Sequence, residues 1–180
     1  RARAKDPEKG YAVDFVSSVL KLNLRQIADQ KIKILSNAGG VNPEACAKAI
    51  RELIKELKLD LKVAVVLGDE LIAKKDKFSD QNLKEMYSET DFPKIENIAS
   101  INAYLGAFPI AQALNDGADI VITGRSVDSA VTLAACIYSF GWQEDEYNKL
   151  AGGSLAGHII ECGTQSTGGN FTDWEESTKN

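Results

Sequence analysis

The chain has 180 residues, of which 44% are hydrophobic and 26% charged, and its formal net charge is -5. This composition is typical of a soluble globular protein with a real core, and the negative charge argues against nucleic acid as a partner. No apolar run is long enough to cross a bilayer, so no membrane partner is expected. The three cysteines are far apart in the sequence. They predict unpaired thiols in a reducing compartment, the cytoplasm or the mitochondrial matrix.

The first third of the chain predicts helices followed by a strand and a further helix. Apolar residues at helical spacing indicate helices at residues 11–20 and 22–30, and a β-branched run indicates a strand at residues 31–35. Asn42 is a good N-cap and Pro43 suits the first position of a helix. We therefore expect a helix over residues 43–58, with Cys46, Ala49, Ile50, Leu53 and Leu57 on its buried face.

A second strand is predicted at residues 61–67, where Gly68 and Asp69 close an apolar run. The strand, helix and strand with short links form a βαβ unit, which predicts parallel pairing of the two strands and a right-handed crossover. Residues 69–97 are rich in lysine and acidic residues. We interpret them as a surface excursion, which either covers the strand ends or is a solvated insertion.

The rest of the chain continues the alternation of strands and helices. We expect strands at residues 98–103 and 118–123, and helices at residues 109–115, 127–140 and 151–162. The result is an α/β layered, Rossmann-like fold with a mainly parallel sheet flanked by helices. We expect one domain over residues 1–174 and a polar tail at residues 175–180. Because the chain begins without methionine in helix-like sequence, we expect it to be a piece of a longer protein.

Glycine-containing loops follow all four predicted strands, at residues 37–40, 68–69, 103–106 and 123–126. In a parallel sheet the carboxyl ends of the strands share one edge, and ligands bind there in open α/β sheets. Glycine lets the backbone approach a ligand, and helix N-termini provide free N–H groups. The pattern predicts a pocket for a small anionic molecule at this edge, although each loop alone is ordinary turn chemistry.

Within this pocket, Arg125 is the best candidate for holding an anion, because its planar fork suits a carboxylate or a phosphate. The alternative is a structural ion pair with Asp128 or Asp69. Asp69 and Asp128 are the candidates for proton transfer. The competing roles are a turn residue for Asp69 and a dipole-stabilising residue in a first helical turn for Asp128. The predicted substrate-binding residues are Asn37, Gly39, Gly40, Gly124, Arg125 and Ser126, and for Asn37 a turn role competes.

Other motifs are weak or missing. The glycines lack the GxGxxG pattern of dinucleotide folds and the GK[ST] of a P-loop, so no nucleotide cofactor is supported and the cofactor is left unassigned. A single histidine, His158, excludes a multi-histidine metal site, and we predict no metal. His158 and Cys162 are four residues apart. On a helix they form either a thiolate–imidazole pair or, in the favoured reading, ordinary core packing.

Several long motifs resemble the acyclic terpene utilisation family, the AtuA-like proteins. They are NAGGVNP at residues 37–43, NAYLGAFPI at 102–110, GADIVITGR at 117–125, DSA at 128–130, AGH at 156–158, ECG at 161–163 and TGGNFTDW at 167–174. The resemblance runs from about Asp6 to Trp174. Family members are longer at both ends, and their early glycine-rich strand and loop has no counterpart here.

The resemblance implies a role in the breakdown of geraniol- and citronellol-type terpenes, which proceeds through acyl-CoA thioesters. We therefore expect an enzyme of acyclic terpene or branched-chain acyl-CoA catabolism, acting on an acyl-CoA or a carboxylate. The alternative is a non-catalytic binding or assembly component of a catabolic complex. The expected partners are a small anionic substrate, for example an acyl-CoA, and further copies of the chain in a homo-oligomer. The resemblance assigns no catalytic residues.

Overall fold

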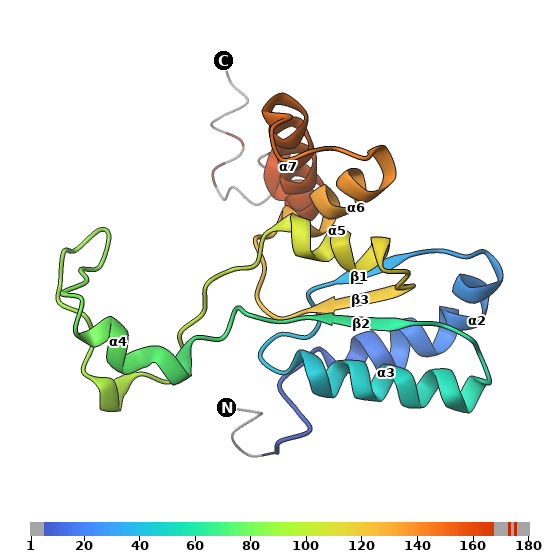
Figure 1. The fold of residues 1–180 in the computed structure, drawn as a ribbon, viewed down its shortest axis with the longest axis horizontal. Coiled ribbons are helices and arrows are strands. Elements are labelled where there is room, and N and C mark those ends of the chain that lie inside the picture. The colour runs from blue at the N-terminus through green and yellow to red at the C-terminus, as the bar shows by residue number, and fades with distance from the viewer. Residues whose placement is uncertain (1–5, 168–172, 174, 176–180) are drawn as a thin grey trace.

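A computed structural model describes residues 6–167, 173 and 175. Its sheet contains three parallel strands, β1 (Ile34–Ser36), β2 (Val63–Val66) and β3 (Ile120–Thr123), in the order β1-β3-β2. Ile34 of β1 and Val63 of β2 both lie opposite Ile120 of the central strand. Helices flank both faces of the sheet (Figure 1). The predicted α/β fold with a parallel sheet is confirmed.

The helices form two layers. On one face lie a π-helical stretch, η1 (Phe15–Leu20), and the helices α2 (Lys21–Asp29) and α3 (Pro43–Leu57). The other face carries α5 (Ala107–Asn115), α6 (Ala130–Phe140) and α7 (Tyr147–Cys162), which is followed by the short η4 (Gly163–Thr167). The predicted break near residue 21 is absent, because Leu20 keeps helical backbone angles (φ -69°, ψ -42°) and η1 continues into α2.

The central strand β3 divides the hydrophobic core in two. Ile120 and Ile122 pack with α2 and α3 on one face, while Val121 packs with α5 and α6 on the other. All three side chains are fully buried. Alternating side chains of a strand point to opposite faces, so a strand covered on both faces needs a continuous apolar run. This requirement accounts for the sequence of β3.

Two predictions about the strands are wrong. The first and second predicted strands are parallel but do not pair with each other, because β3 lies between them. The predicted strand at residues 98–103 does not form. There, Asn102 makes only an isolated antiparallel bridge to Glu70. This stretch is the return path of the excursion, so its backbone pairs with the outgoing path and does not join the sheet.

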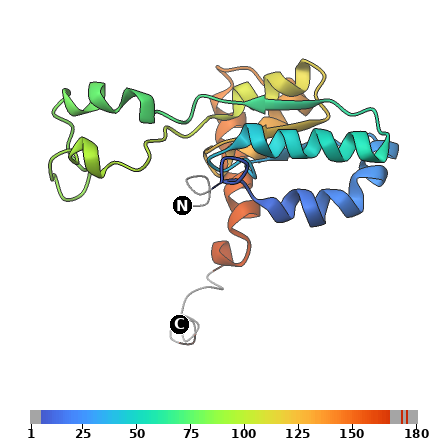
Figure 2. The same cartoon turned by 90° about the horizontal axis from the view of Figure 1, so that it is seen from below.

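The excursion forms an arm, defined here as residues 71–100. It contains η2 (Ile72–Lys74), α4 (Lys75–Ser79) and η3 (Ile95–Asn97). The arm projects away from the body and does not fold over the strand ends (Figures 1 and 2). None of its residues is buried, which agrees with a solvated insertion. A bond between the main-chain N–H of Leu71 and the carbonyl of Ile101 (2.7 Å) closes its base.

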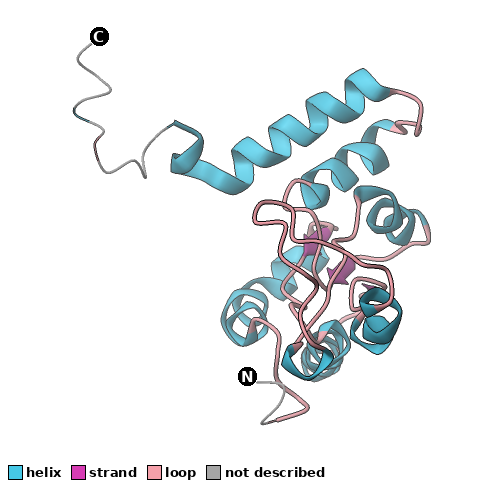
Figure 3. Cartoon of the chain, turned by 90° about the vertical axis from the view of Figure 1, so that its left-hand side faces the viewer, coloured by secondary structure: helices cyan, strands magenta, loops and turns pink. Residues whose placement is uncertain are grey.

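Helix α7 begins at Tyr147, earlier than predicted, and lies beside α6 (Figure 3). Its glycines allow this close packing. A Cβ on Gly153 would lie 2.8 Å from both Leu133 and Trp142, and one on Gly157 would lie 2.7 Å from the carbonyl of Ser129. The helix therefore tolerates residues of poor helical propensity because they bring it close to its neighbour. Residues 176–180 of the predicted polar tail lie outside the described residues.

Candidate functional site

Asp69 links the ends of two strands at the carboxyl edge of the sheet. It follows β2, and its side chain is only 4% exposed. Its Oδ2 atom accepts hydrogen bonds from the main-chain N–H of Arg125 (3.0 Å) and from the side-chain amide of Asn102 (2.9 Å). One carboxylate thus joins the end of β2, the turn after β3 and the segment that follows the arm.

Gly124 makes room for this carboxylate. A Cβ at position 124 would lie 2.3 Å from Oδ1 of Asp69 and 2.7 Å from its Cγ. Real Cβ atoms do not approach other atoms so closely, so any side chain would push the carboxylate away. The close approach of the Asp69 carboxylate therefore explains why residue 124 is glycine, whether or not a ligand binds at this turn.

Arg125 presents its guanidinium at the surface next to Tyr104. Its Nη2 atom donates a hydrogen bond to the Tyr104 hydroxyl at 2.7 Å, and its Cζ atom lies 4.9 Å from the centroid of the tyrosine ring. The hydrogen bond to Tyr104, and then the nearby Asp128 and Asp69 carboxylates, raise the pKa of the guanidinium. None of the described carboxylates lies within 4.0 Å of it. The alternative structural ion pair is therefore not formed in the described part of the chain.

Ser126 and Asp128 lie in the turn between β3 and α6. Ser126 is 2% exposed, and its hydroxyl has no hydrogen-bond partner among the residues that the structure describes. Asp128 is exposed. The sequence had predicted Asp128 in the first turn of this helix. That prediction is wrong, because α6 begins at Ala130 and Asp128 precedes it. The turn therefore contains a buried polar atom and an exposed carboxylate close to Arg125.

The loop after β1 packs against the end of β3. A Cβ on Gly39 would lie 2.3 Å from the carbonyl of Thr123, so only glycine allows this approach. Gly40 has a positive φ of 55°, and its N–H donates to the carbonyl of Asn37 at 3.1 Å. The Asn37 side chain is exposed. These contacts give both glycines a packing role, and binding by the three residues stays a prediction.

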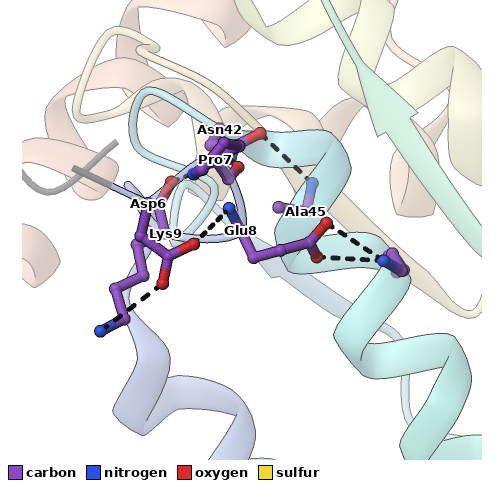
Figure 4. A network of polar contacts seen from close by, with 7 residues as sticks. Asp6, Pro7, Glu8, Lys9, Asn42 and Ala45 are labelled. Atoms are coloured by element: carbon purple, nitrogen blue, oxygen red, sulfur yellow. Dashed lines mark hydrogen bonds and ion pairs between the residues drawn. The ribbon is translucent and has the colours of Figure 1, made fainter. Parts of the chain in front are cut away.

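A cleft of about 210 Å³ opens beside Asp69. Asp69, Asn102 and the residues around the start of α3 line it. Asn42 fixes this wall (Figure 4). Its Oδ1 accepts from the N–H of Ala45 at 3.4 Å, and its amide donates to the carbonyls of Pro7 and Lys9 at 2.7 and 2.8 Å. The predicted N-cap at Asn42 is confirmed, and the same side chain also anchors the N-terminal segment.

His158 and Cys162 lie in contact on α7, and a thiolate–imidazole pair stays a prediction. The Cys162 sulfur lies 3.8 Å from both ring nitrogens of His158, and it donates to Glu161 at 3.3 Å. The Glu161 carboxylate raises the pKa of the Cys162 thiol, which disfavours the thiolate. His158 is exposed, so the favoured prediction of core packing is wrong. Among the residues described here, no group of three His, Cys, Asp or Glu side chains is arranged to hold a metal.

The structure brings the predicted residues together in part. Asp69, Gly124 and the main chain of Arg125 form one connected unit, and Asp128 lies near the Arg125 side chain. Of the predicted site residues, Asp69 lines the cleft, whereas the lining does not include Asn37, Gly39, Gly40, Gly124, Arg125, Ser126 or Asp128. Sequence reasoning missed Asn102 and Tyr104 as partners of Asp69 and Arg125. The only feature of the sequence that pointed to these two residues was the predicted loop at residues 103–106, which was expected at the same edge of the sheet.

Comparisons with known proteins were made for the whole chain. A family model described as "Acyclic terpene utilisation family protein AtuA" matches residues 1–180. Neither the search of curated proteins nor that of solved structures found a match. Over the described residues, no helix combines the length and the apolar character that spanning a bilayer requires.

Proposed function

The chain belongs to the acyclic terpene utilisation family AtuA, and we propose that it binds a small organic anion at the carboxyl edge of its sheet. In this proposal it is an enzyme of acyclic terpene or branched-chain acyl-CoA catabolism, and its substrate is a carboxylate or an acyl-CoA. The three unpaired cysteines, Cys46, Cys136 and Cys162, support a reducing compartment such as the cytoplasm or the mitochondrial matrix.

The state of Arg125 carries the proposal. Its described hydrogen-bond partner is a neutral phenol, and none of the described carboxylates forms an ion pair with it, so the positive charge is held in place with its donors available to a ligand. A guanidinium in this state can bind a carboxylate or a phosphate through two parallel hydrogen bonds. Ser126, whose buried hydroxyl has no hydrogen-bond partner among the described residues, and then the start of the 11-residue helix α6 follow in the chain. Both are suited to further contacts with an anion.

The two carboxylates receive different roles in this proposal. Asp128 is exposed and lies near Arg125, so it is our first candidate for proton transfer to or from a bound substrate. Asp69 is buried, and two hydrogen bonds already occupy its Oδ2 atom. It holds the Arg125 turn in position. It also lines the cleft, which keeps it as the second candidate for proton transfer.

Binding to Arg125 can be tested by calorimetry with isovalerate, isovaleryl-CoA, coenzyme A and inorganic phosphate as probes. At 100 times Kd, a ligand stabilises the folded state by about 2.7 kcal/mol, so a thermal shift also reports binding. We expect Arg125→Ala to weaken binding of the best probe at least about tenfold, because a bidentate charged contact is lost. Arg25→Ala, which removes an exposed arginine from α2, is the matched control. Equal affinity of Arg125→Ala and the wild type would refute the proposal.

The arm favours a second candidate function, a binding or assembly component of a catabolic complex. It exposes Met86 (78%) and Tyr87 (85%) near its tip, and none of its residues is buried. Exposed methionine and aromatic side chains are enriched at protein interfaces. In this proposal the chain forms a homo-oligomer through the arm. A monomeric mass in light scattering at high concentration would refute self-assembly, whereas a concentration-dependent mass that Met86→Ser and Tyr87→Ser reduce would support it.

A further inference from the structure

Tyr104 is fixed beside Arg125 by main-chain contacts on both sides of the pair. The N–H of Leu105 donates to the carbonyl of Arg125, and the N–H of Val127 donates to the carbonyl of Leu105, each at 3.0 Å. These two bonds form a parallel bridge between Leu105 and Ser126. The residue before Leu105 therefore has a set position relative to the turn that carries Arg125.

The side chains of the pair are arranged for more than packing. A phenol has one proton to donate and two lone pairs to accept with. The Tyr104 oxygen accepts from Nη2 of Arg125, which uses one lone pair and leaves the phenol proton free to point elsewhere. The side chain is 52% exposed, so this proton is accessible from solution. The hydroxyl of Tyr104, as a donor, and the charged guanidinium of Arg125 thus lie side by side at the surface.

We propose that Tyr104 is a binding residue of the anion site: its hydroxyl holds the Arg125 guanidinium and donates its own proton to an oxygen of the bound anion. This inference rests on the proposed function of Arg125. It specifies a ligand group with at least two acceptor oxygens, a carboxylate or a phosphate, because one oxygen faces the guanidinium and another faces the phenol. The two possible sources of that group are a free branched-chain acid and the phosphates of coenzyme A.

Calorimetry of the full chain separates these sources, with isovalerate, coenzyme A and inorganic phosphate as the probes. Tyr104→Phe keeps the ring over the guanidinium and removes only the hydroxyl. We expect it to weaken binding of the best probe by about tenfold or more, since hydrogen bonds to charged groups are among the stronger ones. Tyr147→Phe, which removes an exposed hydroxyl from the start of α7, is the matched control and should bind as the wild type does.

A double-mutant cycle distinguishes binding from a purely structural role. If the Tyr104 hydroxyl contacts the anion itself, Tyr104→Phe weakens binding further when it is added to Arg125→Ala, whereas a tyrosine that only positions Arg125 has no further effect in that background. The ¹⁵N NMR signal of the Arg125 side chain should also shift on addition of the anion, and shift less in Tyr104→Phe. Circular dichroism confirms that each variant is folded.

The outcomes separate this inference from the proposed function. Wild-type affinity in Tyr104→Phe, together with lost binding in Arg125→Ala, would overturn the role of Tyr104 and leave the anion site of Arg125 standing. Unchanged binding in Arg125→Ala, or no binding of any probe by the wild type, would overturn both. Loss of affinity in both single variants, with a further loss when Tyr104→Phe is added to Arg125→Ala, supports the inference.

Discussion

Substitution of Gly124 by alanine tests how tightly the end of β3 closes over Asp69. The new Cβ would lie 2.3, 2.7 and 2.8 Å from Oδ1, Cγ and Oδ2 of the carboxylate. All three distances are below any normal contact, and the carboxyl group is nearly fully buried. Gly124 is not among the residues with positive φ, so the backbone itself accepts alanine and the effect isolates this one steric conflict.

The loss of stability in Gly124→Ala depends on whether the Asp69 side chain moves away from the new Cβ. If Asp69 withdraws, it loses at least one of the two hydrogen bonds that its Oδ2 accepts, and bonds to a charged group are worth about 1.5–3 kcal/mol. If it stays, overpacking costs about 1–3 kcal/mol. We therefore expect Gly124→Ala to lower the free energy of unfolding by about 2–3 kcal/mol. For a chain of this length, the melting temperature falls by about 4–12 °C. Urea unfolding followed by fluorescence measures the change.

The matched control is Gly152→Ala in α7, where an added Cβ meets nothing within 4 Å. The same chemical change should there raise the free energy of unfolding by about 1 kcal/mol, because alanine is the better helix former. Combining Gly124→Ala with Asp69→Ala should cost less than the two single changes together, since they remove the same contact. A Gly124→Ala variant as stable as the wild type would refute the packing of Asp69 against this turn.

Three further changes probe contacts that hold the helices and the sheet in place. Asn42→Ala should destabilise the protein by about 1–2 kcal/mol in urea unfolding, because it removes the cap of α3. Burial alone would raise the pKa of Asp119, but the hydrogen bonds from the Lys33 side chain and a main-chain N–H lower it overall. The ionised carboxylate therefore stabilises the fold above the ordinary pKa of 3.8. Asp119→Asn should be less stable at neutral pH, by a deficit that shrinks as the pH falls below this value. Arg51→Ala uncovers the carbonyl of Val63 on the outer strand β2. It should increase light scattering at high concentration, because an uncapped edge strand invites pairing.

Each of these changes has an outcome that contradicts its reasoning. Wild-type stability of Asn42→Ala would mean that α3 does not depend on its cap. A deficit of Asp119→Asn that is constant from pH 7 to pH 2 would exclude ionisation as its cause. Equal scattering of Arg51→Lys and Arg51→Ala, both above the wild type, would show that the guanidinium geometry and not the charge protects the edge. Scattering unchanged in both would refute protection by this residue.

Local signals in the sequence determined the helices well where they were strong. Asn42 and Pro43 mark the start of α3. Of its predicted apolar face, Cys46, Ile50 and Leu53 are buried and Ala49 and Leu57 partly buried, while the buried Ala47 and Ile54 were not predicted. The helix extends over Pro43–Leu57, one residue shorter than predicted. Capping and helical periodicity act within a few residues of each other, so a single stretch of sequence contains all the information they need.

The candidate site was only partly visible in the sequence. The Thr123–Ser126 turn and Asp69 were expected at one edge because parallel strands place their carboxyl ends together. The bond between Asp69 and Arg125 joins residues 56 positions apart, and that between Arg125 and Tyr104 spans 21 positions. No local sequence pattern indicates a partner this far away in the chain. The wrongly predicted strand at residues 98–103 also concealed the loop to which Tyr104 belongs.

By itself, the sequence determined the type of fold, the best helix boundaries and the family. Tertiary structure alone decided that β3 lies between β1 and β2, that the arm projects outward, and that Arg125 meets a phenol. The reason is physical. An apolar run reports that a segment is buried, and a polar turn reports that it is exposed, but neither specifies the neighbour against which it packs.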